Sequence, residues 1–154
     1  MNSTDLAWLA GIMEGEGTFS IYHQKRKEKH AGPNGQLRAT VSLTNTDVFL
    51  IEKAYQVFKD IGVNFHISEY KNKKGSTRPV FDMQTARQEN VKLICEALMP
   101  YLFGEKKAKA QMLLRFVNTR IAKGKTMYDD DDWVQFKSFR SPTTTRETEI
   151  KDIV

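Results

Sequence analysis

The chain has 154 residues, a length that suits one globular domain with a proper hydrophobic core. Its composition, 40% apolar and 28% charged, is ordinary for a soluble domain. No apolar run reaches the ~20 residues that a membrane span needs, and the N-terminal stretch lacks the basic start of a signal peptide. The single cysteine, Cys95, excludes an internal disulfide and a cysteine-based zinc cluster. These features favour an intracellular, non-secreted protein with no membrane partner.

The formal net charge of +5 is unevenly distributed. Lys and Arg outnumber Asp and Glu by 20 to 12 through Lys125, whereas acidic residues lead by 7 to 4 from Thr126 onward. A basic body with a mildly acidic tail indicates an anionic partner, and nucleic acid is favoured over a membrane surface. Charge alone leaves the question open, because +5 also suits an ordinary soluble surface.

The first predicted element is a helix from Thr4 to about Gly15, because its apolar residues are too dense for an alternating strand. We expect Ser3 or Thr4 to cap its start. Gly15 and Gly17 are expected to end it.

Two pairs of strands are predicted from period-2 alternation, each pair followed by a helix. The first pair buries Phe19, Ile21, Leu37, Ala39, Val41 and Leu43, with a turn at residues 32–35. The second pair alternates Phe65 and Ile67 with His66 and Ser68, then Phe81 and Met83 with Asp82 and Gln84, around a turn at residues 73–76.

Helices are predicted at about 48–58, 88–99 and 106–122, the first of them capped within residues 45–47. The acidic run 129–132 is interpreted as the first turn of a short helix. We favour this over a metal site, because four adjacent side chains point in several directions. A last helical turn is expected near residues 147–153.

The element order is that of an α+β fold in which helices cover one face of an antiparallel sheet. Residues 1–125 are expected to form the core domain, and residues 126–154 a helical extension of it.

The most unusual segment is Gly11-Ile12-Met13-Glu14-Gly15-Glu16-Gly17. Gly11 and Gly15 lie on one stripe of the predicted helix and would let a second helix approach closely. Glu14 and Glu16 lie at the C-terminal end of that helix, where the macrodipole disfavours anions by about 0.3–1 kcal/mol each. A divalent cation would neutralise them, and helix-terminal carbonyl groups would add oxygen ligands. Two solvated surface glutamates are the simpler interpretation of the same residues.

The segment from Leu9 to Gly17, followed by Thr18 and Phe19, resembles the LAGLIDADG motif of homing endonucleases. The order αββαββα agrees with that family, and the resemblance covers about residues 5–122. It implies an antiparallel, saddle-shaped sheet with helices on one face.

The resemblance also implies an active site. Glu16 is expected to bind Mg²⁺ together with the Gly15 carbonyl group, and Mn²⁺ or Ca²⁺ could replace Mg²⁺ in binding. Asn45 corresponds to a polar residue that orders water, although a helix-capping role is equally open. Lys106 best matches a basic residue near the attacking water, with Lys107 as the alternative. Glu14 is given a structural role at the helix end.

Only one copy of the motif is found, which implies a homodimer with Trp8, Gly11, Ile12 and Gly15 at its interface. A twofold-symmetric dimer would bind a roughly palindromic site, each subunit contributing one Glu16.

Strand alternation predicts which side chains face double-stranded DNA. The predicted DNA-binding residues are Ser20, Tyr22, Gln24, Arg26, Lys27, Gln36, Arg38, Thr40, Ser42, His66, Ser68, Tyr70, Asn72, Lys73, Arg78, Asp82 and Gln84. Arg, Gln and Asn suit base edges in the major groove, and the loop lysines suit phosphates.

The leading hypothesis is a metal-dependent homing endonuclease that makes a staggered double-strand break. The alternative is a non-catalytic binder on the same fold, either an intron maturase or a DNA-binding regulator. Tyr22 and Tyr70 would also stack on unpaired bases. An acidic residue at position 16 favours catalysis, since a pure binder has no use for it.

Overall fold

The computed structural model describes residues 2–25, 35–71 and 78–140. The elements are α1 (Ser3–Glu16), β1 (Gly17–Gln24), β2 (Gln36–Asn45), α2 (Val48–Ile61), β3 (His66–Lys71), β4 (Pro79–Thr85), α3 (Gln88–Leu98), a 3-10 turn (Met99–Tyr101), α4 (Glu105–Lys123) and α5 (Asp130–Phe139). None of these helices combines the length and apolar composition that crossing a bilayer requires. The predicted turns at 32–35 and 73–76 lie largely or wholly outside the described residues, as does the predicted last turn at 147–153.

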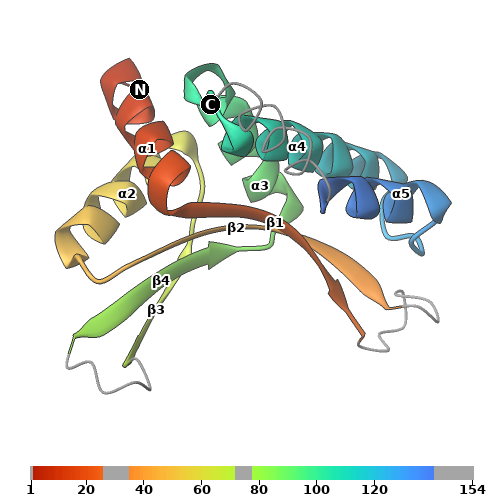
Figure 1. Ribbon diagram of the computed structural model, residues 1–154, viewed down its shortest axis with the longest axis horizontal. Helices are drawn as coiled ribbons and strands as arrows, with labels where there is room; N and C mark the ends of the chain where they lie inside the picture. The colour runs from red at the N-terminus through yellow and green to blue at the C-terminus, as the bar shows by residue number, and fades with distance from the viewer. Residues whose placement is uncertain (1, 26–34, 72–77, 141–154) are drawn as a thin grey trace, which may run out of the picture.

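The strands form one antiparallel sheet in the order β1-β2-β4-β3. Figure 1 shows the sheet as an arch with the helices on its outer side. Its inner, concave side carries none of the described helices. The predicted α+β fold with helices on one face is therefore confirmed.

The helix-covered side of the sheet is the core. The predicted inward residues of the first strand pair, from Phe19 to Leu43, are all at most 4% exposed and pack with Leu9 and Met13 of α1. Burying each large side chain of this kind contributes about 1.5–3 kcal/mol. The prediction was wrong for Ile67, which is 39% exposed. Ile67 lies on β3, an edge strand that the helices cover little, whereas the other edge strand, β1, is covered by α4 and α5.

Short polar side chains set where two helices begin. Asn2, in extended conformation, accepts a hydrogen bond from the Thr4 N–H at 2.9 Å, so the predicted cap at Ser3 or Thr4 was wrong by one or two residues. Asp47 caps α2, within the predicted range. Gly62 ends α2 in the left-handed region (φ 99°), which glycine adopts without strain.

The acidic run begins α5, as predicted. Asp129 is the N-cap, and its side chain and that of Asp132 accept hydrogen bonds from each other's backbone N–H groups. α5 packs against α4 and β1, and the rings of His23 and Trp133 meet edge to face with centroids 5.1 Å apart.

Candidate active site

The end of α1 is fixed by a close approach. The Gly17 N–H donates to the Met13 carbonyl, and the chain then continues into β1 in extended conformation. A Cβ at position 17 would lie 2.9 Å from the Met13 Cα, so only glycine fits this junction. Helix α1 therefore ends at Glu16, one residue beyond the predicted Gly15.

Glu16 is the last residue of α1 and is exposed. Within residues 2–25, 35–71 and 78–140, no hydrogen bond or ion pair engages its carboxylate. The helix dipole disfavours an anion at this position. An unneutralised carboxylate at a helix C-terminus is therefore available to a cation.

Lys106, the second residue of α4, brings an amine to the same junction. Its Nζ donates a hydrogen bond to the Gly17 carbonyl. Burial lowers the pKa of Lys106, with a further lowering from Lys109, while the charges of Glu105, Glu14 and Glu16 oppose that shift.

The geometry separates the two candidate lysines. Among the described residues, the hydrogen bond of Lys107 in this region is a backbone one, in which its N–H donates to the Gly104 carbonyl at 3.0 Å. Lys106 is therefore the lysine whose side chain reaches the end of α1.

Glu14 has a different environment from Glu16. Its Oε1 accepts hydrogen bonds from the backbone N–H groups of Phe103 at 2.8 Å and Gly104 at 3.3 Å. Gly104 is the N-cap of α4, so the Glu14 charge lies at the positive end of that helix dipole. This contact supplies a structural reason for a carboxylate that α1 alone would disfavour.

Asn45 is engaged locally. Its Oδ1 accepts from the Asp47 N–H at 2.8 Å, which shapes the turn before α2. It is in register with Phe81, on the same alternation as the buried Val41 and Leu43. Its side-chain amide nitrogen is the group left for the predicted contact with water.

The described part of the chain offers few candidate metal ligands. No cluster of three His, Cys, Asp or Glu side chains that could hold a metal occurs in the described part of the chain. The Glu16 carboxylate and the Gly15 carbonyl, near the end of α1, are hard oxygen donors of the kind that Mg²⁺ prefers. These donors fit the ion in type but are too few, so further ligands would come from substrate, water or a second copy.

The concave face of the sheet carries polar side chains in register. Thr18, Ser42, Gln84 and His66 form one row across all four strands. Thr44, Asp82 and Ser68 form the next row, where the Thr44 hydroxyl donates to Asp82 at 2.8 Å. Thr18 and Thr44 were missed from the sequence, although they follow the same alternation as Ser20 and Ser42.

Most predicted DNA-binding residues are accessible. Exposed or half-buried are Ser20, Tyr22, Gln24, Gln36, Arg38, Ser42, His66, Ser68, Tyr70, Arg78, Asp82 and Gln84. Thr40, also predicted to contact DNA, is on the same alternation as Ser42 but is only 4% exposed. Thr40 pairs with Ser20 at the centre of the sheet, where a short side chain presents little area. Arg26, Lys27, Asn72 and Lys73 lie outside the described residues.

The predicted interface stripe is open on α1. Gly11 and Gly15 are exposed, and a Cβ added to either would meet no atom within 4 Å. Trp8 and Ile12 flank them, half-buried against the core, and the Lys53 amine lies 4.4 Å from the Trp8 ring centroid.

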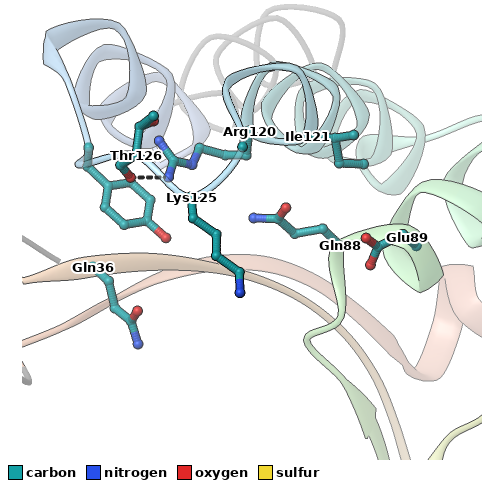
Figure 2. A pocket seen from close by; sticks show the side chains of 9 residues that line it. Gln36, Gln88, Glu89, Arg120, Ile121, Lys125 and Thr126 are labelled. Carbon is teal, nitrogen blue, oxygen red and sulfur yellow. Dashed lines mark hydrogen bonds between the residues drawn. The ribbon is translucent and has the colours of Figure 1, made fainter. Parts of the chain in front are cut away.

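A separate pocket of about 340 Å³ lies at the far end of β2. Figure 2 shows Lys125 reaching toward β2 and Gln88 pointing in from the start of α3, while the Arg120 guanidinium is bound to the Thr126 carbonyl. Gln36 of this pocket pairs with Gln24, at the opposite end of β1 from Gly17. The pocket is therefore remote from Glu16 and Lys106.

The fold and this junction define a class of α+β proteins in which an acidic motif helix enters an arched sheet. Comparison with known proteins identifies the family. The family described as LAGLIDADG endonuclease matches residues 9–117, well over half of the chain. The chain belongs to that family. No curated protein sequence matches it.

Solved structures share the fold at low sequence identity. The homing endonuclease I-CvuI, in complex with the I-CreI target, is 21% identical, with a TM-score of 0.58 over 76% of this chain and 69% of its own. I-CeuI in complex with DNA is 18% identical, with a TM-score of 0.60 over 76% and 55%. The meganuclease I-SmaMI, bound to uncleavable DNA, is 18% identical, with a TM-score of 0.69 over 93% and 46%. The chain thus spans about half the length of I-CeuI and I-SmaMI.

Proposed function

We propose that the chain is a divalent-metal-dependent DNA endonuclease that acts as a homodimer and makes a staggered break in a long, roughly palindromic site. This proposal rests on the junction of α1, β1 and α4, where the Lys106 amine binds the Gly17 carbonyl, next in sequence to the exposed Glu16, and lies within electrostatic range of the Glu16 carboxylate. Similar structures of this family were solved with DNA and Mg²⁺ or Ca²⁺, which supports a DNA substrate and such a metal.

In this proposal Glu16 and the Gly15 carbonyl hold Mg²⁺, which would polarise the scissile phosphate and lower the pKa of a bound water. Lys106 holds a positive charge beside the attacked phosphate. Polar residues of the concave face contact base edges, and lysines and arginines at its margins contact phosphates.

A second copy is supported by the open Gly11 and Gly15 stripe and by a nearby apolar side chain. Phe103, whose N–H is bound by Glu14, is 78% exposed. Exposed apolar surface beside a close-approach stripe is typical of an interface. Two copies would bring two Glu16 carboxylates to one site.

The test uses a library of duplex DNA incubated with the purified chain and Mg²⁺, with sequencing of the cleaved ends. We expect a palindromic consensus and a fixed overhang. Glu16→Gln should lower the cleavage rate by roughly a thousand-fold or more, because several kcal/mol of charge stabilisation are lost. Binding of the consensus DNA should persist.

Glu96→Gln, the same chemical change on the exposed side of α3, is the matched control and should cut normally. Cutting by Glu16→Gln at the wild-type rate would refute the assignment of Glu16. A wild-type chain that binds DNA without cutting it would instead support the non-catalytic alternative.

A further inference from the structure

Glu14 is the acidic residue of the motif that the proposed reaction does not use. It lies two residues before Glu16 on a helix, so the two side chains point in different directions. Instead of solvent or a cation, its carboxylate engages backbone that lies about 90 positions later in the sequence.

The start of α4 is attached to the end of α1 at two points. At the first point, the Glu14 carboxylate accepts hydrogen bonds from the backbone N–H groups of Phe103 and Gly104. At the second, Lys106 donates to the Gly17 carbonyl. The two contacts are two to three positions apart along the start of α4 and three positions apart along the end of α1. They therefore close a small ring of contacts around Glu16.

We propose that Glu14 is a positioning residue that holds the start of α4 in place and thereby keeps the Lys106 amine beside Glu16. This inference rests on the proposed nuclease function for the meaning of that position. A lysine side chain is long and flexible, so its amine is located by its backbone origin and its last contact. Glu14 fixes the backbone from which the Lys106 side chain starts, and the Gly17 carbonyl fixes the position of its amine.

The Glu14 carboxylate packs closely against the start of α4, so its removal should alter the position of that turn. A Cβ added at Gly104 would lie 3.4 Å from the Glu14 Oε2, so the carboxylate fills the space beside the α4 N-cap. Without the carboxylate, two backbone N–H groups lose their acceptor. The turn is then free to move to another acceptor or to water.

One pair of variants changes the acceptor. Glu14→Ala removes it, whereas Glu14→Gln keeps an oxygen that can accept both N–H groups. We expect Glu14→Ala to lower kcat by roughly ten- to a hundred-fold with little change in KM, because misplacing a catalytic group by about 1 Å has effects of this size. Glu14→Gln should recover most of kcat.

A second pair changes the donor and leaves the motif helix intact. Phe103→Pro removes one N–H group, and the extended Leu102 before it (φ −83°, ψ 148°) suits a following proline. Phe103→Ala removes the same exposed ring but keeps the N–H. Because both variants also remove a ring proposed for the dimer interface, Phe103→Ala is the reference for Phe103→Pro. We expect kcat of Phe103→Pro to lie roughly ten- to a hundred-fold below that of Phe103→Ala, as kcat of Glu14→Ala lies below that of the wild type.

The position of Lys106 can be followed without DNA. Acetylation of Lys106 by acetic anhydride, measured by mass spectrometry, should be faster in Glu14→Ala and Phe103→Pro, because the amine is released from the Gly17 carbonyl. Glu105→Gln is the control for charge, since Glu105 also raises the pKa of Lys106, but its carboxylate pairs with Lys109 at 3.3 Å and not with the N–H groups of Phe103 and Gly104. Its acetylation rate should stay below that of Glu14→Ala.

The two proposals fail separately. If wild-type protein cuts no DNA, the nuclease proposal fails, and the acetylation rates alone decide the role of Glu14. If Glu14→Ala does not fold, the two Phe103 variants decide. Wild-type kcat and wild-type Lys106 reactivity in folded Glu14→Ala and Phe103→Pro would overturn the positioning role.

Discussion

The two ends of α4 treat charge in opposite ways. At its C-terminal end, the Arg120 guanidinium is 4% exposed and contacts the fully buried Asp132 at 3.0 Å. Lys123 contacts Asp129 at 2.6 Å, and Arg120 also lies 4.0 Å from the centre of the Tyr128 ring. At its N-terminal end, Lys106 reaches only a carbonyl group, and the neighbouring Glu16 is exposed and unengaged in the described structure.

This difference separates charges that build the fold from charges that are available to a ligand. The Arg120 guanidinium is bound to Asp132 and to the Thr126 carbonyl, which leaves its buried Nε without a partner in the described structure. Both charges of this pair are therefore used within the fold, and breaking the pair leaves an uncompensated charge. An exposed carboxylate at an unfavourable helix end keeps its full capacity for a cation. The acidic run 129–132 is therefore structural, although it has more carboxylates than the motif has.

The largest expected effect is on the structural end. Asp132→Ala leaves Arg120 buried without its partner, so we expect the free energy of unfolding to fall by about 3–5 kcal/mol. Chemical denaturation of the purified protein measures this. Asp130→Ala, an exposed change in the same first turn, should cost less than about 1 kcal/mol.

A double variant that removes both charges tests whether the lost stability comes from the unpaired charge of Arg120. Replacing both buried charges, with Arg120→Met and Asp132→Leu together, should recover much of the stability lost in Asp132→Ala. A double variant no more stable than the single one would show that the other hydrogen bonds of these two side chains, to the Thr126 carbonyl and from the Asp129 N–H, hold this end together rather than the ion pair.

At the functional end, Lys106→Met should lower the cleavage rate by about a hundred-fold, or about 2.7 kcal/mol, while leaving stability nearly unchanged. Lys107→Met is the matched control, since the Lys107 side chain makes no contact with the end of α1 in the described structure. Equal losses in both variants would contradict the distinction between the two lysines.

Features that depend on residues close together in the sequence could be predicted, whereas features that depend on distant residues could not. Period-2 alternation predicted the buried face from Phe19 to Leu43, and cap chemistry predicted the start of α5 near Asp129, because both depend on neighbours along the chain. Alternation did not predict that Ile67 is exposed or that Thr40 is buried. The exposure of these residues depends on the order of the strands and on which strands the helices cover, and neither is a local property.

Some features of the candidate site could likewise be predicted from the sequence, and others could not. The carboxylates and glycines of the motif stand out in the sequence, since Glu14 and Glu16 oppose a helix dipole. The partner of Glu14 does not, because Phe103 and Gly104 bind it through backbone N–H groups that every residue except proline has. The choice between Lys106 and Lys107 also needed the structure, since adjacent helix residues differ only in which way they point.

Gly11→Ala tests whether a second copy of the chain packs on the Gly11 and Gly15 stripe of α1. Alanine at an exposed helix position should stabilise an isolated protomer by about 0.5–1 kcal/mol, because no atom lies within 4 Å of the added Cβ. If a second copy packs on this stripe, the same methyl group should weaken the dimer. Analytical ultracentrifugation across a range of concentrations measures both states, and an unchanged dimer constant would place the interface elsewhere.

The smallest expected effect concerns the exposed part of the structural end. The hydrogen bond from Lys123, and then that from the Asp132 N–H, hold the pKa of Asp129 below its ordinary value of 3.8. A carboxyl whose folded pKa is depressed adds stability that is present above the unfolded pKa and is lost as the pH falls through the folded one. The hydrogen bond to Asp129 likewise raises the pKa of Lys123 above 10.5, so its contribution is lost only as the pH rises beyond that value.

Asp129→Asn keeps an oxygen for the cap but removes the charge. We expect the wild type to melt at a slightly higher temperature than the variant at pH 7, and the gap to close as the pH falls below about 4. Solvent screening keeps this effect smaller than that of Asp132→Ala, because Asp129 is exposed whereas Asp132 is buried. A gap that is constant from pH 3 to pH 7 would show that the charge contributes nothing, and that the two ends of α4 differ only in their buried pair.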